Sequence, residues 1–339
     1  MNEQFNRKIS EAINNDEKDI VTRLLQEIEA TDVNTDIKIY NPYNGDRFET
    51  ITPLHLAVAN DLFEAAKSLL KNGANINGTA TIGVHEHRTP LALAVDNNNF
   101  EMVKLLLKHK ADVNIAPPEG ADIGKTPLWL AAFLNNNEII KLLLANGANA
   151  NIAPTIGRAK KLSPLLLTTR HDNLEIVELL LKQNVDINAV STEGPYKGET
   201  PLFIAVGHHQ SEIAKILVAK HANVNIANVE GVTPVMLATS NGNFELVEFL
   251  VRHGAEVVNL ESENWKKALH NAKTIGAHKC VDFIENAHKT GPLVYMLAQR
   301  DREGKGSPIS TMHTDLIRRV KTMLTGEPKN SKPKKPQPN

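Results

Sequence analysis

The sequence predicts an all-α repeat solenoid, in which short helix pairs stack on one another. Three observations favour it. A Thr/Ser-Pro phrase recurs six times in register, two short apolar helical segments follow the phrase, and aromatic residues make up only 4% of the chain, so the core is aliphatic. Self-similarity at a fixed period of this length is typical of stacked repeats.

Each copy of the phrase predicts the start of a helix. The copies begin at Thr52, Thr89, Thr126, Ser163, Thr200 and Thr233, with four intervals of 37 residues and a last one of 33. The hydroxyl of Thr or Ser can cap a helix, and Pro fits the first helical turn because its missing N–H costs nothing there. Six first helices are therefore expected.

The third copy illustrates the rest of a repeat. An apolar helix at 128–132 leads to the polar turn 135–137 and to a second helix at 138–144 with a wide apolar stripe. Gly147 comes next and can take the left-handed conformation that ends a helix. Each copy is thus expected to be one helix pair.

Over roughly residues 1–289 the chain resembles the ankyrin repeat family. The resemblance rests on the Thr-Pro-Leu-x-Leu-Ala starts, as at Thr52–Ala57, and on endings such as Gly147-Ala148-Asn149. It implies antiparallel helix pairs joined by projecting hairpin fingers. It also implies partners that contact the finger tips and the inward ends of the first helices.

Departures from the family pattern predict local weakness. Among the six copies, only the first has the His that is usual in the family's opening motif, His55. The Gly that usually ends the second helix is replaced by Lys110, Asn184 and His221. A left-handed residue other than Gly costs about 1–2 kcal/mol, with Asn tolerated best. The second and fifth repeats should be the weaker ones.

The 37-residue spacing exceeds the family's usual 33, and the helices align without gaps. The extra residues must therefore lie in the fingers, which contain turn-forming Gly and Pro. Four consecutive lengthened fingers are expected, at Gly78–Arg88, Ile115–Lys125, Ile152–Leu162 and Ala189–Glu199.

The domain organisation follows from these patterns. Terminal repeats must hide an apolar face and usually look abnormal. We expect an N-terminal capping repeat with a long hairpin, then six repeats, a degenerate repeat, a helical cap and a disordered Lys/Pro-rich tail. Their bounds are 1–50, 51–253, 254–289, 290–325 and 326–339.

Charge and composition limit the classes of function that the sequence supports. Residues 290–339 hold ten Lys or Arg and four Asp or Glu, a charge of +6, whereas residues 1–289 hold 28 basic and 35 acidic residues, a charge of −7. No secretory signal or membrane-length apolar run is seen. Cys280 is the single cysteine, so neither an internal disulfide nor a Cys-based zinc site is expected, and a buried structural thiol is favoured over a nucleophile.

One apolar pair stands out among the predicted ends of the first helices. Phe133 and Leu134 occupy positions where solvent is expected. An apolar centre ringed by Arg and Tyr has the composition of a protein-binding hot spot. The alternative is that the fingers fold over Phe133 and bury it. The other candidate contact residues are Arg158, Lys160, Lys161, Arg170, His171 and Tyr196.

The sequence also carries weaker functional signals. The family resemblance implies asparagine hydroxylation at Asn114, with Asn188 as the second match. The finger sequence His85-Glu86-His87 is better explained as a solvated loop than as a metal site. The helix predicted at 308–324 carries basic residues opposite an apolar face; we favour a cap over a membrane-binding or groove-binding segment.

These observations predict a non-enzymatic scaffold, a cytoplasmic monomer without cofactor, metal or small-molecule substrate, that binds a folded protein across its middle repeats. Nucleic acid and membrane are not expected as partners. The Asn- and Lys-rich composition is also similar to that of the ankyrin-repeat effectors that intracellular bacteria inject into host cells without a classical signal peptide. The rival hypothesis is an enzyme, or a membrane- or nucleic-acid-targeted protein, whose activity resides in the basic region 290–339.

Overall fold

A computed structural model describes residues 3–29, 32–40, 48–80, 87–118, 122–155, 159–194 and 197–291. The chain forms two compact units, Met1–Ile204 and Ala205–Asn339. The boundary lies inside α11 (Pro201–Gly207). The cap and tail predicted after residue 291 and the motif residues His85 and Glu86 lie outside the described residues.

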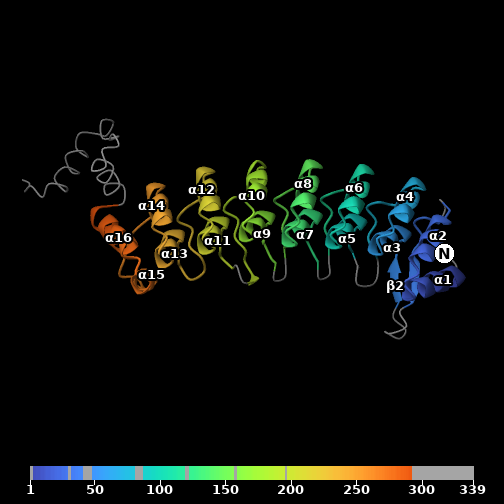
Figure 1. The fold of residues 1–339 in the computed structure, drawn as a ribbon, viewed down its shortest axis with the longest axis horizontal. Helices are drawn as coiled ribbons and strands as arrows, with labels where there is room; N and C mark the ends of the chain where they lie inside the picture. Colours follow the sequence, from blue (N-terminus) through green and yellow to red (C-terminus); the bar gives the residue numbers. More distant parts are fainter. Residues whose placement is uncertain are drawn as a thin grey trace, which may run out of the picture. The chain divides into compact units, whose positions relative to one another are not determined.

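Helix pairs stacked in chain order make up most of the first unit. Their first helices lie in one row and their second helices in another (Figure 1). Neighbouring first helices contact one another from α3 to α9, as do the second helices α6, α8 and α10. The pairs are α3 (Pro53–Ala59) with α4 (Phe63–Lys71), α5 (Pro90–Asp96) with α6 (Phe100–Lys108), α7 (Pro127–Phe133) with α8 (Asn137–Ala145), and α9 (Pro164–Arg170) with α10 (Leu174–Leu181). We number these pairs repeats 1 to 4.

The predicted N-terminal cap and hairpin are present. Helices α1 (Glu3–Asn14) and α2 (Lys18–Gln26) precede strands β1 (Ile37–Tyr40) and β2 (Phe48–Ile51), which pair antiparallel. α1 contacts β1, and α2 contacts α4 of repeat 1. Buried side chains such as Ile9, Leu25 and Ile37 show that this segment covers the end of the repeat stack.

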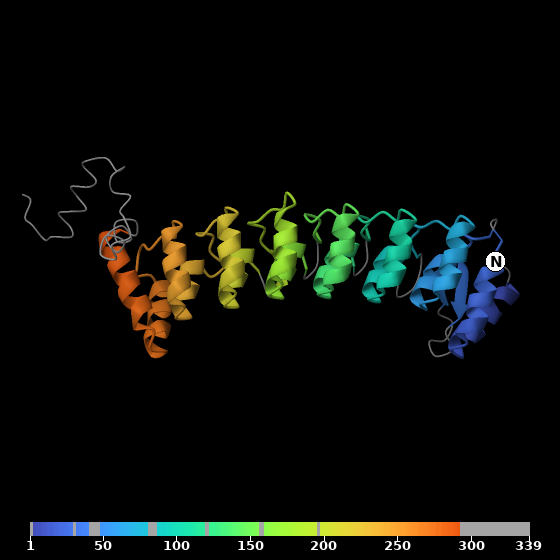
Figure 2. The ribbon, with the colours of Figure 1, turned by 45° about the horizontal axis from the view of Figure 1, so that its top comes forward.

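The second unit continues the pattern. It contains the end of α11, then α12 (Ser211–Ala219), α13 (Pro234–Ser240), α14 (Phe244–Arg252), α15 (Glu263–Thr274) and α16 (His278–Thr290). Contacts of α13 with α15 and of α14 with α16 stack the last pair on the one before it, as Figure 2 shows. The degenerate pair α15–α16 is longer than the others. Its Trp265 and Ile284 are fully buried.

The Thr/Ser-Pro phrase starts a helix at all six positions. In five copies the hydroxyl accepts a hydrogen bond from the backbone N–H three residues on, as Thr126 does from Trp129 at 3.2 Å. The sixth copy differs: Thr233 makes no capping bond. Its buried hydroxyl has no hydrogen-bond partner among the residues the structure describes.

Asparagine and aspartate make most of the turns within the pairs. Left-handed residues at these turns include Asp61, Asn98, Asn135 and Asp172, with φ of 56–57°. Short polar side chains tolerate this conformation best. The following Asn of repeats 2, 3 and 4 caps the second helix through its side chain, as Asn136 does by accepting from the N–H of Ile139 at 2.9 Å.

A ladder of asparagine side chains connects successive repeats. Asn114 accepts a hydrogen bond from the N–H of Asn149 at 2.8 Å and donates to the carbonyl of Gly147 at 3.3 Å. Asn151 does the same one repeat later with Asp186 and Asn184. Together with the caps, this ladder gives a physical reason why about one residue in ten is Asn.

A left-handed residue was expected after each second helix, and the structure confirms it in all but one of these repeats. Gly73, Gly147 and Gly254 have positive φ, and so do the replacements Lys110 and His221, as predicted. Asn184 does not: α10 ends one residue early, and the predicted left-handed cap is wrong there.

The physical difference in repeat 4 is a missing closing bond. In the other repeats an Ala N–H donates to a Leu carbonyl five residues back, as Ala148 does to Leu143 at 3.0 Å, in the Schellman pattern. Repeat 4 has Val185 at this position, and its N–H bonds to Gln183 instead. Val185 is half-buried, whereas the five alanines are buried.

Restoring the family ending in repeat 4 should stabilise the protein. We expect Asn184→Gly with Val185→Ala to raise the free energy of unfolding by about 1 kcal/mol, since the closing bond and a strain-free left-handed Gly are gained. Thermal melting should shift upward by about 2–4 °C. The matched control is Gly147→Asn with Ala148→Val in repeat 3, which should shift it downward. Equal melting temperatures for all three proteins would contradict the explanation.

Candidate functional site

In two repeats the third residue of the first helix bonds to the segment that leads into the next repeat. In repeat 1 this is His55, whose Nε2 lies 2.9 Å from the carbonyl oxygen of Arg88. In repeat 3 it is Trp129, whose indole Nε1–H donates to the carbonyl of Leu162 at 2.7 Å. Both acceptors lie 33 residues further on. Trp129 therefore makes the same kind of inter-repeat bond as His55, although it replaces the family's usual His.

Trp129 also packs against Phe133, one of the two exposed apolar residues. Its ring stacks on Phe133 with centroids 5.3 Å apart and planes 10° apart. The amino group of Lys125 lies 5.5 Å from the centroid of the same ring, within reach of a cation–π interaction. Trp129 and Phe133 are four residues apart on one face of α7, whereas Lys125 precedes the capping residue Thr126.

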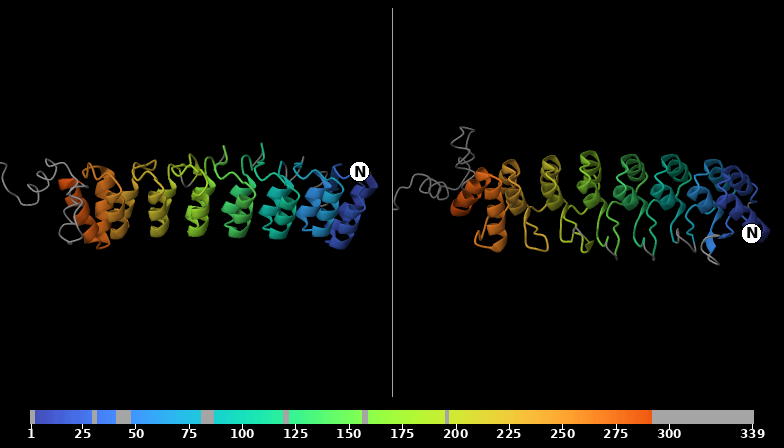
Figure 3. Two further views of the ribbon diagram at one scale, coloured as in Figure 1. Left: turned by 90° about the horizontal axis from the view of Figure 1, so that it is seen from above. Right: turned by 60° about the horizontal axis from the view of Figure 1, so that its bottom comes forward.

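Phe133 and Leu134 are exposed in the structure. Their exposed fractions are 53% and 42%, although the six residues before them in α7 are buried. The alternative that fingers fold over Phe133 is therefore not what the structure shows. Each finger leads into the N-terminal end of a first helix, whereas Phe133 is the last residue of α7. Figure 3 (right) shows these connecting loops along one side of the helix pairs.

Two of the predicted basic neighbours lie beside this pair. Arg170 and His171 end α9, which contacts α7. The His171 ring is hydrogen-bonded to the backbone of Phe133. Partial burial and the nearby Arg170 charge lower the pKa of His171 in spite of that bond. At neutral pH the imidazole is therefore mainly uncharged, and Arg170 supplies the positive charge. We call Phe133, Leu134, Arg170 and His171 the inner-end patch.

The remaining predicted residues lie elsewhere. Lys160 and Lys161 are at the base of the next finger, where the carbonyl of Lys160 accepts bonds from Thr192 and Ser191. The bond between Trp129 and Leu162 connects that finger to α7. Arg158 and Tyr196 lie outside the described residues.

A charged network that the sequence analysis missed reaches Trp129 through Lys125. Asp122 accepts hydrogen bonds from Lys125 at 2.7 Å and from Arg88 at 2.6 Å, and Arg88 also pairs with Asp96 at 2.6 Å. Partial burial raises the pKa of Asp122, but the two cations outweigh it, so this pKa lies below its ordinary value of 3.8. The network joins the fingers of repeats 2 and 3.

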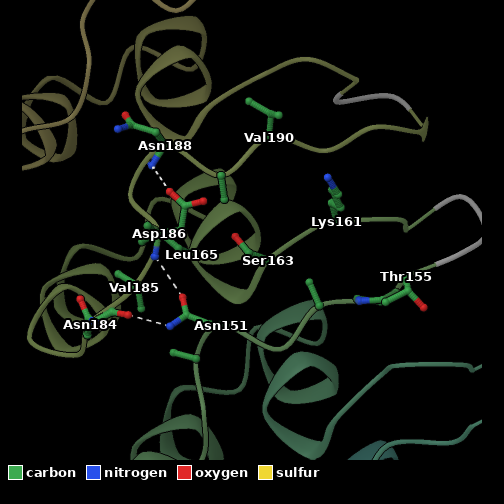
Figure 4. A pocket seen from close by; sticks show the side chains of 14 residues that line it. Asn151, Thr155, Lys161, Ser163, Leu165, Asn184, Val185, Asp186, Asn188 and Val190 are labelled. Atoms are coloured by element: carbon green, nitrogen blue, oxygen red, sulfur yellow. Dashed lines mark hydrogen bonds between the residues drawn. The ribbon is translucent and has the colours of Figure 1, made fainter.

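A cavity of about 680 Å³ lies between the finger that leads into α9 and the finger that leads into α11 (Figure 4). Its wall includes the open end of α10 at Asn184 and Val185, the ladder residue Asn151, and Lys161. Figure 4 shows Asn151 bonded to this loop, so its amide is already engaged. Lys161 thus belongs to the cavity wall rather than to the inner-end patch.

The candidate hydroxylation sites lie in the repeat-closing loops. Asn114 is a ladder residue with both ends of its amide bonded, and Asn188 is half-buried with its N–H bonded to Asp186 at 3.0 Å. Hydroxylation at either stays a prediction. Mass spectrometry after incubation with the hydroxylase would test it, and the absence of a one-oxygen mass gain would contradict it.

Three findings concern metal binding, thiol reactivity and membrane crossing in the described part of the chain. Within it, no group of three or more His, Cys, Asp or Glu side chains could hold a metal ion. Cys280 is buried as predicted, and burial raises the pKa of its thiol, which disfavours the nucleophilic thiolate. None of the described helices is long and apolar enough to cross a bilayer.

The stacked helix pairs and their closing loops define a helical repeat protein. A family model described as "Ankyrin repeats (3 copies)" matches residues 9–117, 80–154, 128–228, 165–261 and 220–291. The chain belongs to the ankyrin repeat family. Such repeats generally mediate protein–protein interaction, and proteins built from them are typically non-enzymatic scaffolds. No curated protein matches the chain.

Proposed function

We propose that the chain is a non-enzymatic scaffold that binds a folded protein through the inner-end patch. The observation that carries the proposal is the exposure of Phe133 and Leu134, 53% and 42%, on a rigid repeat. Exposed large apolar side chains lose unfavourable hydration when a partner covers them. Aromatic and Arg residues are the commonest binding hot spots.

The surroundings of the pair define the partner's chemistry. On the repeat 4 side lie Arg170 and the mainly neutral His171. On the repeat 2 side lies Asp96, whose charge is balanced by Arg88. The complementary surface is therefore an apolar centre with a carboxylate that faces Arg170.

Preorganisation favours tight binding by this patch. Phe133 lies on Trp129, which is buried and bonded to the next repeat. The backbone of Phe133 is bonded to His171. Little conformational freedom remains to be lost on association, which reduces the entropic cost of binding.

Affinity purification with matched variants tests the proposal. The wild type, the Phe133→Ala, Leu134→Ala, Arg170→Ala variant and a Val229→Ala, Val258→Ala control are each incubated with eukaryotic cytosol. Val229 and Val258 are 62% and 58% exposed, so the control also removes apolar surface. A eukaryotic extract is suitable because the partner would be a eukaryotic cytosolic protein both for an injected effector and for an endogenous scaffold.

The patch variant should lose a protein that the wild type and the control both retain. For the purified partner we expect calorimetry to show binding weakened by about 30-fold or more, which corresponds to a hot-spot loss of about 2 kcal/mol. Circular dichroism should show all three proteins folded. Equal recovery of the same proteins by all three would refute the patch.

A further inference from the structure

The cavity between the fingers that lead into α9 and α11 has the size and wall of a small-molecule site. Its volume of about 680 Å³ lies within the range of about 300–1,000 Å³ that is usual for such sites. Aliphatic side chains form much of the wall, among them Leu165, Val185 and Val190, and none of its described lining residues is aromatic. Val185 and Val190 are only half-buried, so apolar surface remains available to a ligand.

Lys161 brings a positive charge to this cavity from a backbone position that does not favour lysine. Its φ of 59° is left-handed, and its N–H donates to the carbonyl of Pro154 at 2.7 Å across the base of the finger. In the fingers on either side the same bond is made by Gly124 and Gly198, each 37 residues away and each with positive φ. Glycine adopts this conformation without strain. Since the finger does not require lysine here, the strained residue points to a role of its side chain.

Asp186 brings a negative charge that its own turn does not need. Its Oδ1 accepts a hydrogen bond from the N–H of Asn188 at 3.0 Å. One repeat earlier, Asn149 accepts the same bond from Asn151 at 2.9 Å, so an uncharged amide oxygen is sufficient for this turn. Figure 4 shows the second carboxylate oxygen of Asp186 directed away from the bond to Asn188. This oxygen is therefore in a position to accept from a ligand.

The two charges line one cavity from different segments of the chain. Lys161 lies on the finger that leads into α9, and Asp186 lies in the loop that follows α10 (Figure 4). Both side chains are exposed, and neither forms an ion pair with a residue that the structure describes. Opposite charges with aliphatic surface between them are complementary to a molecule that carries one charge at each end.

We propose that this cavity binds a small zwitterion with an aliphatic middle. The carboxylate of the ligand pairs with Lys161, its ammonium group pairs with Asp186, and its methylene groups cover Leu165 and Val185. Burial of the methylene groups supplies the hydrophobic part of the affinity, and the two charges fix the orientation. This ligand site is separate from the inner-end patch and does not depend on it.

Titration of the full chain with ω-amino acids tests the site. The probes are 4-aminobutanoate, 6-aminohexanoate and 8-aminooctanoate, which carry their two charges at different separations. Nuclear magnetic resonance of labelled leucine and valine methyl groups reports on Leu165, Val185 and Val190, with the exposed Val229 and Val258 as references. At least one probe should shift the three cavity signals with a Kd of about 1 mM and leave the references in place. If none of the probes shifted the cavity signals, the proposal would be overturned.

Matched variants test the two charge contacts separately. Lys161→Gly and Asp186→Asn should stay folded, because Gly124 and Asn149 occupy the equivalent positions. Each should weaken binding of the best probe by about five-fold. The control Lys160→Gln removes a neighbouring charge that is not among the described cavity residues, so binding should be unchanged. Hexanoate, which lacks the ammonium group, should bind the wild type more weakly than 6-aminohexanoate does. Unchanged binding by either variant, or equal binding of hexanoate, would refute the corresponding charge contact.

Discussion

Trp129→Ala should lower the free energy of unfolding by about 3–5 kcal/mol, the largest loss that we expect from a single substitution in repeat 3. The change removes a side chain that is 3% exposed and leaves the carbonyl of Leu162 without its donor. It also removes the ring on which Phe133 stacks. Urea unfolding followed by circular dichroism measures the loss.

Two conservative variants separate the contribution of the aromatic ring from that of the N–H hydrogen bond. Trp129→Phe keeps the aromatic volume and removes only the N–H, so it should cost about 1–3 kcal/mol for the unpaired carbonyl. Trp129→His installs the residue that repeat 1 uses for the same bond. If Trp129→Phe were as stable as the wild type, the inter-repeat bond would not contribute to stability.

Asp122→Asn should give the second large effect, a loss of about 2–3 kcal/mol at neutral pH. The change removes a carboxylate that is hydrogen-bonded to both Lys125 and Arg88. Hydrogen bonds to charged groups contribute about 1.5–3 kcal/mol, and a half-buried cation would be left with fewer partners. Thermal melting of both proteins measures the difference.

The difference in free energy of unfolding between these two proteins should depend on pH. The pKa of Asp122 is lower in the folded protein than in the unfolded chain, so its stabilising contribution is fully present above the unfolded value of 3.8. It is lost as the pH falls through the folded value. The stability difference between wild type and Asp122→Asn should thus be constant near neutrality and shrink in acid. A difference that grows in acid would contradict the network.

Local rules were enough to predict the helix pairs. Thr126 and Pro127 start α7 because capping and the first-turn preference of Pro act within a few residues. The hairpin and the exposure of Phe133 were also predictable, since both depend on local pattern and on repeat position. The bounds proposed after residue 291 stay predictions.

Contacts between repeats were harder to predict. The sequence shows Trp129 only as a lost His, because the acceptor of its indole N–H is set by the position of Leu162 in the next repeat. Likewise, Asn184 fits a left-handed cap by its own preference, but the neighbouring Val185 does not make the closing bond.

The asparagine ladder did leave a signal in the sequence. Ladder residues Asn77, Asn114 and Asn151 each bond to the following repeat and are spaced by 37 residues, the interval of the capping phrase. Asn188 and Asn225 continue the series. A periodicity search on single polar residues would have found them. The partners of Asp122 had no such signal, because Arg88 lies 34 residues away in another finger.

The stacking of Phe133 on Trp129 has an optical consequence. Replacement of Trp265 by phenylalanine would leave Trp129 as the sole tryptophan of the chain, and the colour and intensity of its emission would report on a ring that lies directly beneath an exposed aromatic residue. Occupancy of that surface could then be followed in real time without an attached dye. The fluorescence of Trp129 would thus be an intrinsic signal for association at this surface.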